Sequence, residues 1–259
     1  NNIFVSEMES KRYFIELAYN GSAYHGWQRQ RNATSVQQIL EEAISRLKRE
    51  NVSLVGAGRT DTGVHARQMF AHFDVAEEIK NPQELIYLLN GFLKHDIAIK
   101  SIRRVHPSAH ARFDATARDY EYHISTAKDP FCAPLHYYLK KIPDVELMNQ
   151  ASKILLLHDD FQCFSRSNTD VKTFLCNIKN ATWQQKGSSL IFFISANRFL
   201  RNMVRAIVGT LLEVGYKKKE VKDLENVIKS KERGEAGFSV PAHGLYLSRI
   251  EYSQNIFLD

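Results

Sequence analysis

The side chains best suited to chemistry lie in one polar loop, Gly58-Arg-Thr-Asp-Thr-Gly63, which follows the short and mostly apolar stretch 52–55. On extended backbone, residues two apart face the same side, so the guanidinium of Arg59 and the carboxylate of Asp61 can converge on one point. A carboxylate beside a guanidinium stays ionised and can act as a nucleophile or as a base. A surface ion pair, or a turn capped by Asp61, is the alternative for an isolated Arg-x-Asp.

Two kinds of nucleotide-binding loop can be tested against the same stretch. A P-loop requires Lys directly after its last glycine, but Val64 follows Gly63. A dinucleotide-binding loop requires Gly-x-Gly-x-x-Gly, and Asp61 stands at the third glycine position after Gly56 and Gly58. The sequence therefore predicts no nucleotide cofactor.

Composition and charge narrow the class of protein further. The chain has 259 residues, a formal net charge of +6 and three cysteines without Cys-x-x-Cys spacing. The positive charge favours an anionic partner, and the cysteines argue against disulfides and zinc in favour of a reducing, intracellular setting. The histidines show no zinc-binding spacing, so we expect no metal. No run approaches the ~18 apolar residues of a membrane span, and residues 1–8 lack the features of a signal peptide, so we expect a cytoplasmic protein.

Hydrophobic periodicity predicts the elements that must position these residues. Ser35 with Gln38, and Asn81 with Glu84, fit helix-capping boxes. The order in the first half is strand, helix, strand, strand, helix, strand, over residues 13–19, 36–50, the stretch from 52 that leads into the loop, 68–75, 81–91 and 97–105.

The second half repeats that order. Strands are expected over 118–125, 173–185, 190–196 and 244–252, and helices over 144–158, 199–214 and 219–231. The sequence therefore predicts an α+β protein with two ferredoxin-like βαββαβ halves, residues 12–110 and 111–253, and a central cleft between them. Clefts of this kind are the usual place for a site.

Three further groups of residues could complete a site in that cleft. Trp27 and Arg29 share an aromatic and basic loop that suits nucleic acid, although a core tryptophan is the alternative. Arg118 and Tyr120 share one face of a strand, where plain core packing is the alternative. On the helix 199–214, Arg201 and Arg205 lie four residues apart on one side. A buried Arg205 needs a partner, which is Asp61, Glu213 or a backbone carbonyl.

Five stretches in order resemble the signatures of the TruA family of tRNA pseudouridine synthases. The resemblance runs from about residue 13 to residue 252, and it is carried by the following stretches: Gly26-Trp-Gln-Arg-Gln30, Gly58-Arg-Thr-Asp-Thr-Gly-Val-His-Ala66, Arg118-Asp-Tyr-Glu-Tyr122, Phe199-Leu-Arg-Asn-Met-Val-Arg205 and Ala236-Gly-Phe-Ser-Val-Pro-Ala-His-Gly-Leu-Tyr-Leu247. The stretch from Asp160-Phe161 to Phe164-Ser-Arg166 also looks like a family signature.

The resemblance implies a function and a role for particular residues. Asp61 becomes the catalytic carboxylate, Tyr120 packs on the target base, and Arg205 lies beside Asp61, with Arg59 as a further catalytic candidate. We also expect substrate contacts from several other side chains, namely Trp27, Arg29, His65, Arg112 and Arg118.

The implied reaction is the isomerisation of uridine to pseudouridine at positions 38 to 40 of the tRNA anticodon arm. It needs no cofactor, and the family forms homodimers. Whether Asp61 acts as a nucleophile or removes a proton stays open. The alternatives are a synthase that acts on another RNA and a tRNA-binding protein without activity.

Overall fold

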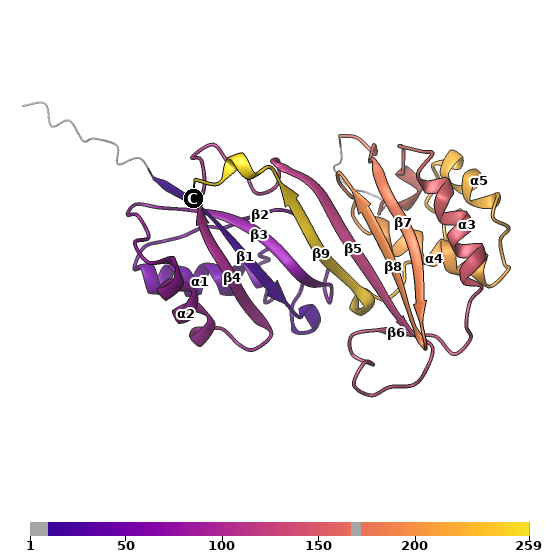
Figure 1. Ribbon diagram of the computed structural model, residues 1–259, viewed down its shortest axis with the longest axis horizontal. Coiled ribbons are helices and arrows are strands. Elements are labelled where there is room, and N and C mark those ends of the chain that lie inside the picture. Colours follow the sequence, from indigo (N-terminus) through magenta and orange to yellow (C-terminus); the bar gives the residue numbers. More distant parts are fainter. Residues whose placement is uncertain (1–9, 167–171, 259) are drawn as a thin grey trace, which may run out of the picture.

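A single sheet runs through the part of the chain that the computed structural model describes, residues 10–166 and 172–258 (Figure 1). Its main strands follow the order β4-β1-β3-β9-β5-β8-β7, with β2 beside β3 and β6 beside β5. Helices alternate with these strands along the chain. The expected α+β class is therefore confirmed.

The N-terminal half has the predicted order of elements. Its elements are β1 (Lys11–Tyr19), α1 (Val36–Lys48), β2 (Val55–Gly56), β3 (His65–Val75), α2 (Pro82–Phe92) and β4 (Ile97–Arg104). Both helices begin at the predicted caps, because Ser35 Oγ accepts the Gln38 N–H at 3.3 Å and Asn81 Oδ1 accepts the Glu84 N–H at 3.1 Å. Strand β1 pairs antiparallel with β3 and β4, which is the ferredoxin-like arrangement.

The C-terminal half repeats this arrangement, with β9-β5-β8-β7 in place of β4-β1-β3-β2. Its elements are β5 (Ala115–Ser125), β6 (Tyr137–Tyr138), α3 (Val145–Leu155), β7 (Ile178–Lys186), β8 (Ser189–Ala196), α4 (Met203–Gly215), α5 (Asp223–Ser230) and β9 (Leu245–Tyr252). Short 3-10 turns lie at Gly21–Ala23, Gln162–Phe164, Ala242–Gly244 and Gln254–Ile256.

Several element boundaries differ from the sequence-based expectation. Helix α4 begins at Met203 rather than at residue 199, because Asn202 takes a left-handed conformation with φ 68°. Helix α1 ends at Lys48 for the same reason, since Arg49 has φ 56°. Strand β7 begins at Ile178 rather than at residue 173.

The two halves meet where β3 and β9 run parallel. Only two residue pairs join these strands, His65 with Tyr246 and Ala66 with Leu247. Each half has its own hydrophobic core, and the Tyr120 side chain packs against both. The division into domains at residues 110 and 111 stays a prediction, and it falls in the connection between β4 and β5.

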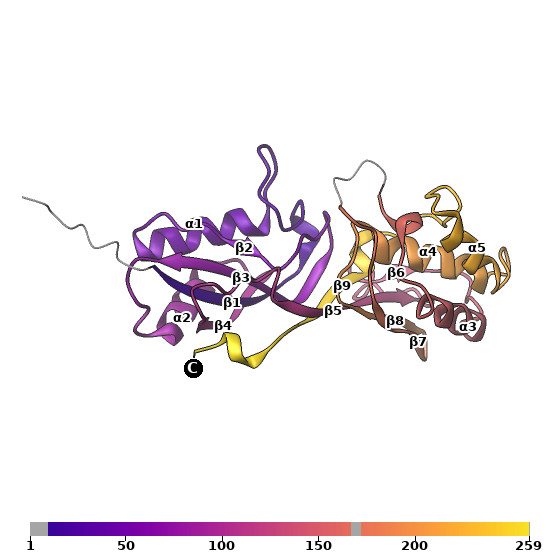
Figure 2. The same cartoon turned by 90° about the horizontal axis from the view of Figure 1, so that it is seen from above.

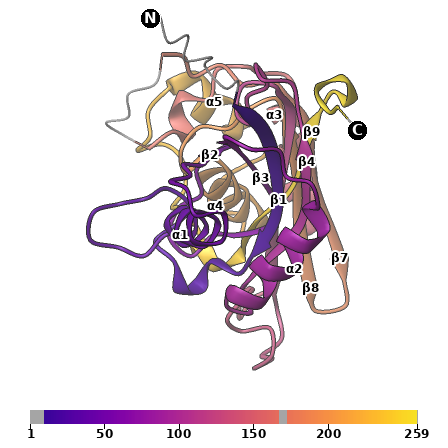
Figure 3. The same cartoon turned by 90° about the vertical axis from the view of Figure 1, so that its left-hand side faces the viewer.

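Helices α1 and α4, one from each half, lie on the same side of the sheet (Figures 2 and 3). The polar loop 57–64 leaves β2 and enters β3 close to the joint between the halves. No helix within the described ranges is long and apolar enough to cross a membrane.

Candidate active site

The polar loop is held firmly by residues of its own half. Tyr19 Oη and Thr60 Oγ1 share a hydrogen bond of 2.9 Å, and the Trp27 N–H donates to the Thr60 carbonyl oxygen at 3.3 Å. Gly26 has φ 83°, and a Cβ there would lie only 2.3 Å from the same oxygen. The backbone just before Asp61 is therefore held by close contacts, and no larger residue at position 26 would permit them.

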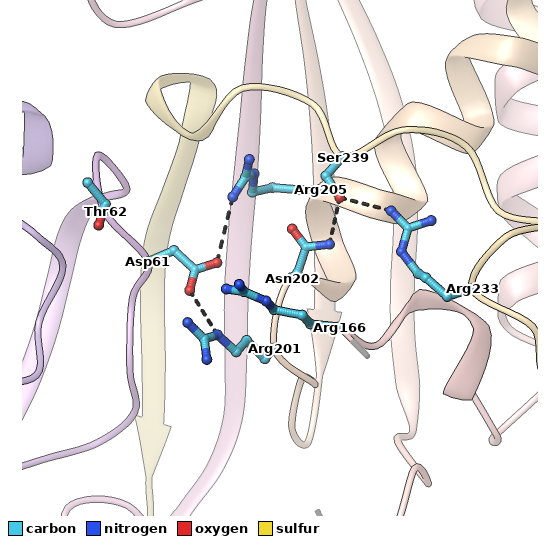
Figure 4. A pocket seen from close by; sticks show the side chains of 8 residues that line it. All are labelled: Asp61, Thr62, Arg166, Arg201, Asn202, Arg205, Arg233 and Ser239. Atoms are coloured by element: carbon cyan, nitrogen blue, oxygen red, sulfur yellow. Dashed lines mark hydrogen bonds and ion pairs between the residues drawn. The ribbon is translucent and has the colours of Figure 1, made fainter. Parts of the chain in front are cut away.

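Asp61 projects from this loop toward two arginines of the opposite half (Figure 4). Arg201 Nε lies 3.5 Å from Asp61 Oδ1, and Arg205 Nη1 lies 3.7 Å from Oδ2. The Asp61 side chain is 30% exposed, so it remains accessible to a ligand. The negative charge of Asp61 thus lies between two guanidinium groups, which attract it.

The surroundings of Asp61 form a polar cavity of about 630 Å³. Its lining comes from both halves and consists of Asp61, Thr62, Arg166, Arg201, Asn202, Arg205, Arg233 and Ser239. Four arginines and one carboxylate give this lining a strong excess of positive charge. Such a cavity suits an anionic ligand.

One wall of the cavity is the segment 236–240, which packs against α4 at backbone distance. A Cβ on Gly209 would lie 1.8 Å from the Phe238 carbonyl oxygen, and a Cβ on Gly237 would lie 2.7 Å from the Thr210 nitrogen. Thr210 Oγ1 accepts the Gly237 N–H at 2.8 Å. These contacts bring the Val240 carbonyl to the Arg205 Nε, which donates to it at 2.6 Å.

Tyr120 lies on β5 at the junction of the two cores. Its ring meets the ring of Phe199 edge to face, with 5.1 Å between centroids. Burial raises the pKa of Tyr120 to about 12; Arg118 opposes this rise, and the negative charge of Asp61 adds to it. The hydroxyl is therefore neutral at physiological pH and within electrostatic reach of the catalytic candidate.

Arg118 is bound to the protein backbone, and its expected contact with substrate stays a prediction. Its guanidinium donates to four carbonyl oxygens, at 3.2 Å to Ala57, 2.6 Å to Arg112, 3.0 Å to Ala115 and 2.8 Å to Asn197. Burial lowers its pKa. Because Ala57 begins the polar loop, Arg118 ties that loop to the strand that carries Tyr120.

Trp27 and His65 are also buried, and a contact of either residue with substrate stays a prediction. The Trp27 ring is 2% exposed and stacks on Tyr19 at 6.3 Å. His65 is 1% exposed; its Nδ1 accepts the Gly21 N–H at 3.0 Å, and its Nε2 lies 3.0 Å from the His243 carbonyl oxygen. Burial lowers the pKa of His65, so it stays neutral, with its proton on Nε2.

Three other predicted residues face solvent. Arg59 is exposed and has no hydrogen bond or ion pair with any residue that the structure describes. It does not pair with Asp61, because the loop is not a strand and the alternation of an extended chain does not apply. The Arg29 side chain is 57% exposed and contacts Glu41 at 3.1 Å, while Arg112 is exposed beside Phe113.

Three arginines of the cavity were given no role from the sequence, although Arg201 was placed on the same side of its helix as Arg205. Arg201 shares the Asp61 contact, although only Arg205 was assigned to it. Arg166 and Arg233 line the same cavity. Arg166 ends the family-like stretch 160–166 and could have been found there, whereas nothing in the sequence around Arg233 distinguishes it from a surface cation.

Comparison with known proteins identifies the family of this chain. The family model described as tRNA pseudouridine synthase matches residues 17–114 and 151–253. The chain is 51% identical over 247 residues to tRNA pseudouridine synthase A of Parabacteroides distasonis, covering 95% of this chain and 98% of the relative. It is 47% identical over 251 residues to the same-named protein of Bacteroides fragilis (96% and 100% covered) and 38% identical over 247 residues to that of Acetivibrio thermocellus (95% and 100%).

The chain therefore belongs to the tRNA pseudouridine synthase family, a class of isomerases that modify RNA.

Proposed function

We propose that this protein converts uridine to pseudouridine in tRNA and that Asp61 is the catalytic carboxylate. The observation that supports the assignment most strongly is the meeting of Asp61 with Arg201 and Arg205 in a cavity built from both halves. Neither half alone supplies the carboxylate and its cations. This is the arrangement expected where a charged group acts on a bound substrate.

The reaction breaks the bond between N1 of uracil and C1′ of the ribose, turns the detached uracil, and joins its C5 to C1′. The proton on C5 is released and N1 gains one, so nothing is oxidised and no group is imported. Asp61 serves either as the nucleophile on sugar or base or as the base that removes a sugar proton. In both routes Arg205 orients the carboxylate, since its own Nε is anchored on Val240.

The target nucleotide must leave its helical stack before its ribose can reach Asp61. Tyr120 lies at the junction of the halves, where its ring can pack on the extruded base. Arg59 stands at the exposed edge of the same loop without a partner among the described residues, so it is placed to fill the gap that the base leaves. Arg29 and Arg112 are exposed cations that can contact the RNA backbone outside the cavity.

Resemblance to the family supports the finer assignments. On that basis we propose positions 38 to 40 of the anticodon arm as the target, a homodimer as the working assembly and the cytoplasm as the compartment. The formal net charge of +6 agrees with a tRNA partner.

A release assay separates this proposal from a tRNA-binding protein without activity. Tritium on C5 of the target uracil should appear in water when the protein acts on a labelled tRNA transcript, without any added nucleotide. Asp61→Asn has nearly the same shape and lacks the charge, so it should bind tRNA and release no tritium. Wild-type binding without release from any tRNA would contradict the proposal, and full release by Asp61→Asn would remove Asp61 from the chemistry.

A further inference from the structure

The cavity around Asp61 holds more positive charge than its one carboxylate can balance. Arg201, Arg205 and Arg233 all line it, and the contacts that the structure describes for Arg233 are with uncharged oxygens. We propose that Arg201, flanked by Arg166, binds one backbone phosphate next to the target uridine, a role different from that of Arg205. This inference rests on the proposed function, because it assigns part of the same substrate.

Arg205 and Arg233 are already committed to the protein. Arg205 has its Nε on the Val240 carbonyl at 2.6 Å, and its side chain is only 21% exposed. Arg233 donates to the carbonyl oxygens of Ala236 and Gly237 and to Ser239 Oγ. Both guanidinium groups therefore hold the wall of the cavity and cannot turn toward a ligand without breaking these bonds.

Arg201 is different in both respects. Its side chain is 56% exposed, and within the described residues its guanidinium makes one contact, from Nε to Asp61 at 3.5 Å. A guanidinium has five N–H donors in a planar fork, so the terminal nitrogens of Arg201 remain for a second partner. A phosphate oxygen pair matches that fork in a bidentate contact.

The backbone keeps Arg201 in place while its side chain stays accessible. Asn202 takes the left-handed conformation, and its Nδ2 donates to Ser239 Oγ at 2.6 Å. The Arg201 carbonyl accepts the Arg166 N–H at 3.1 Å, so the two residues are neighbours across two loops. Both side chains point toward Asp61 in Figure 4.

The chemistry of RNA supplies a ligand at this place. Each ribose is flanked by a phosphodiester on its 5′ side and one on its 3′ side, and each carries one negative charge. When Asp61 reaches the ribose or the base of the target uridine, one of these phosphates lies at the edge of the cavity that Arg201 and Arg166 form. A bidentate contact there would fix the sugar relative to the carboxylate, which positions the reacting atoms.

The test compares charged and uncharged linkages in one RNA. Anticodon stem-loops are made with a methylphosphonate, which removes the charge, at the linkage 5′ or 3′ to the target uridine. Affinity is measured for wild type, Arg201→Gln, and Lys229→Gln as a matched control. Lys229 is an exposed cation on α5 whose partner is Glu225, and it lies outside the cavity.

We expect one of the two neutral linkages to weaken binding by wild type about tenfold, and Arg201→Gln to lose about as much on unmodified RNA. For RNA that carries this neutral linkage, Arg201→Gln should bind with the same affinity as wild type, because the contact between Arg201 and the phosphate charge is already absent. The log–log salt slope of binding should fall by about one unit in Arg201→Gln. Lys229→Gln should behave as wild type throughout.

Two outcomes would overturn the inference. One is additive loss, in which Arg201→Gln and the neutral linkage weaken binding independently. The other is a variant that keeps its affinity and salt slope but loses turnover, which would make Arg201 a second orienting group for Asp61. Tritium release by wild type from unmodified RNA does not depend on either result, so failure here leaves the proposed reaction standing.

Discussion

Asp61 and Arg205 come from opposite halves of the molecule and meet with 3.7 Å between Oδ2 and Nη1. Arg205 reaches this position from the first turn of α4, and its Nε is fixed on Val240 at 2.6 Å. The carboxylate of one half is thus oriented by a guanidinium whose own direction is set within the other half.

Replacement of that guanidinium should slow the reaction far more than it weakens binding. We expect Arg205→Ala to lower turnover on the order of 100-fold or more, because a preorganised charge beside the reacting group is lost. Arg205→Lys should recover only part, since an ammonium lacks the planar fork that contacts Asp61 and Val240 together. Single-turnover kinetics checks this, with thermal melts to confirm folding. Wild-type turnover in Arg205→Ala would make Arg205 a structural residue.

The contact between α4 and the segment 236–240 should tolerate no side chain at position 209. In Gly209→Ala the new Cβ meets the Phe238 carbonyl oxygen, so we expect the free energy of unfolding to fall by about 1–3 kcal/mol. Turnover should also fall, because the Val240 carbonyl that anchors Arg205 would shift. Gly234→Ala is the matched control, because its Cβ would meet nothing within 4 Å. Chemical denaturation and release assays on both variants measure the difference, and equal stabilities would show that the segment adjusts freely.

Arg118 should be irreplaceable even by lysine. Lysine keeps the charge but cannot donate to four carbonyl oxygens in one plane, so Arg118→Lys can leave the part-buried carbonyl oxygens of Ala57 and Ala115 unpaired. Each such acceptor costs ~1–3 kcal/mol. We expect a lower melting temperature, and a larger loss of turnover than Lys229→Gln shows in the same release assay. A variant with wild-type melting would mean that water replaces the lost bonds without cost.

Buried histidines should make the protein less stable in acid. His72 accepts the Ala111 N–H on Nδ1 at 3.1 Å, and burial, with the nearby charge of Arg12, lowers its pKa to about 4. An unfolded histidine takes up a proton near pH 6.5. Between these values the unfolded state binds more protons, so the free energy of unfolding falls as pH falls through this window. Urea denaturation from pH 7 to about 5 checks the trend. The free energy of unfolding of His72→Gln should fall less steeply with pH than that of wild type.

Periodicity and caps identified most of the fold, because helix faces and strand alternation are local properties of the chain. Ser35 and Asn81 start their helices as predicted. The start of α4 was placed four residues early, because Asn202 adopts a conformation that side-chain patterns do not specify.

The site was harder to predict than the fold, because burial depends on tertiary contacts. Trp27 and His65 have side chains that suit RNA recognition, yet packing against Tyr19 and bonds to Gly21 and His243 enclose them. Arg118 was expected at the substrate, and only the structure shows its four backbone acceptors. Spacing also paired Arg59 with Asp61, whereas the true partners come from a segment more than a hundred residues away.

The position of β9 governs when this protein can become active during its synthesis. Strand β9 lies between β3 and β5, although it is the last strand along the described residues. A ribosome that has completed α4 has already made both Asp61 and Arg205. Strand β9 pairs with β3 on one side and with β5 on the other. Until residues 245–252 leave the exit tunnel, no strand pairing joins the half that carries Asp61 to the half that carries Arg205. A nascent or truncated chain without this strand would therefore hold every cavity residue and still lack activity.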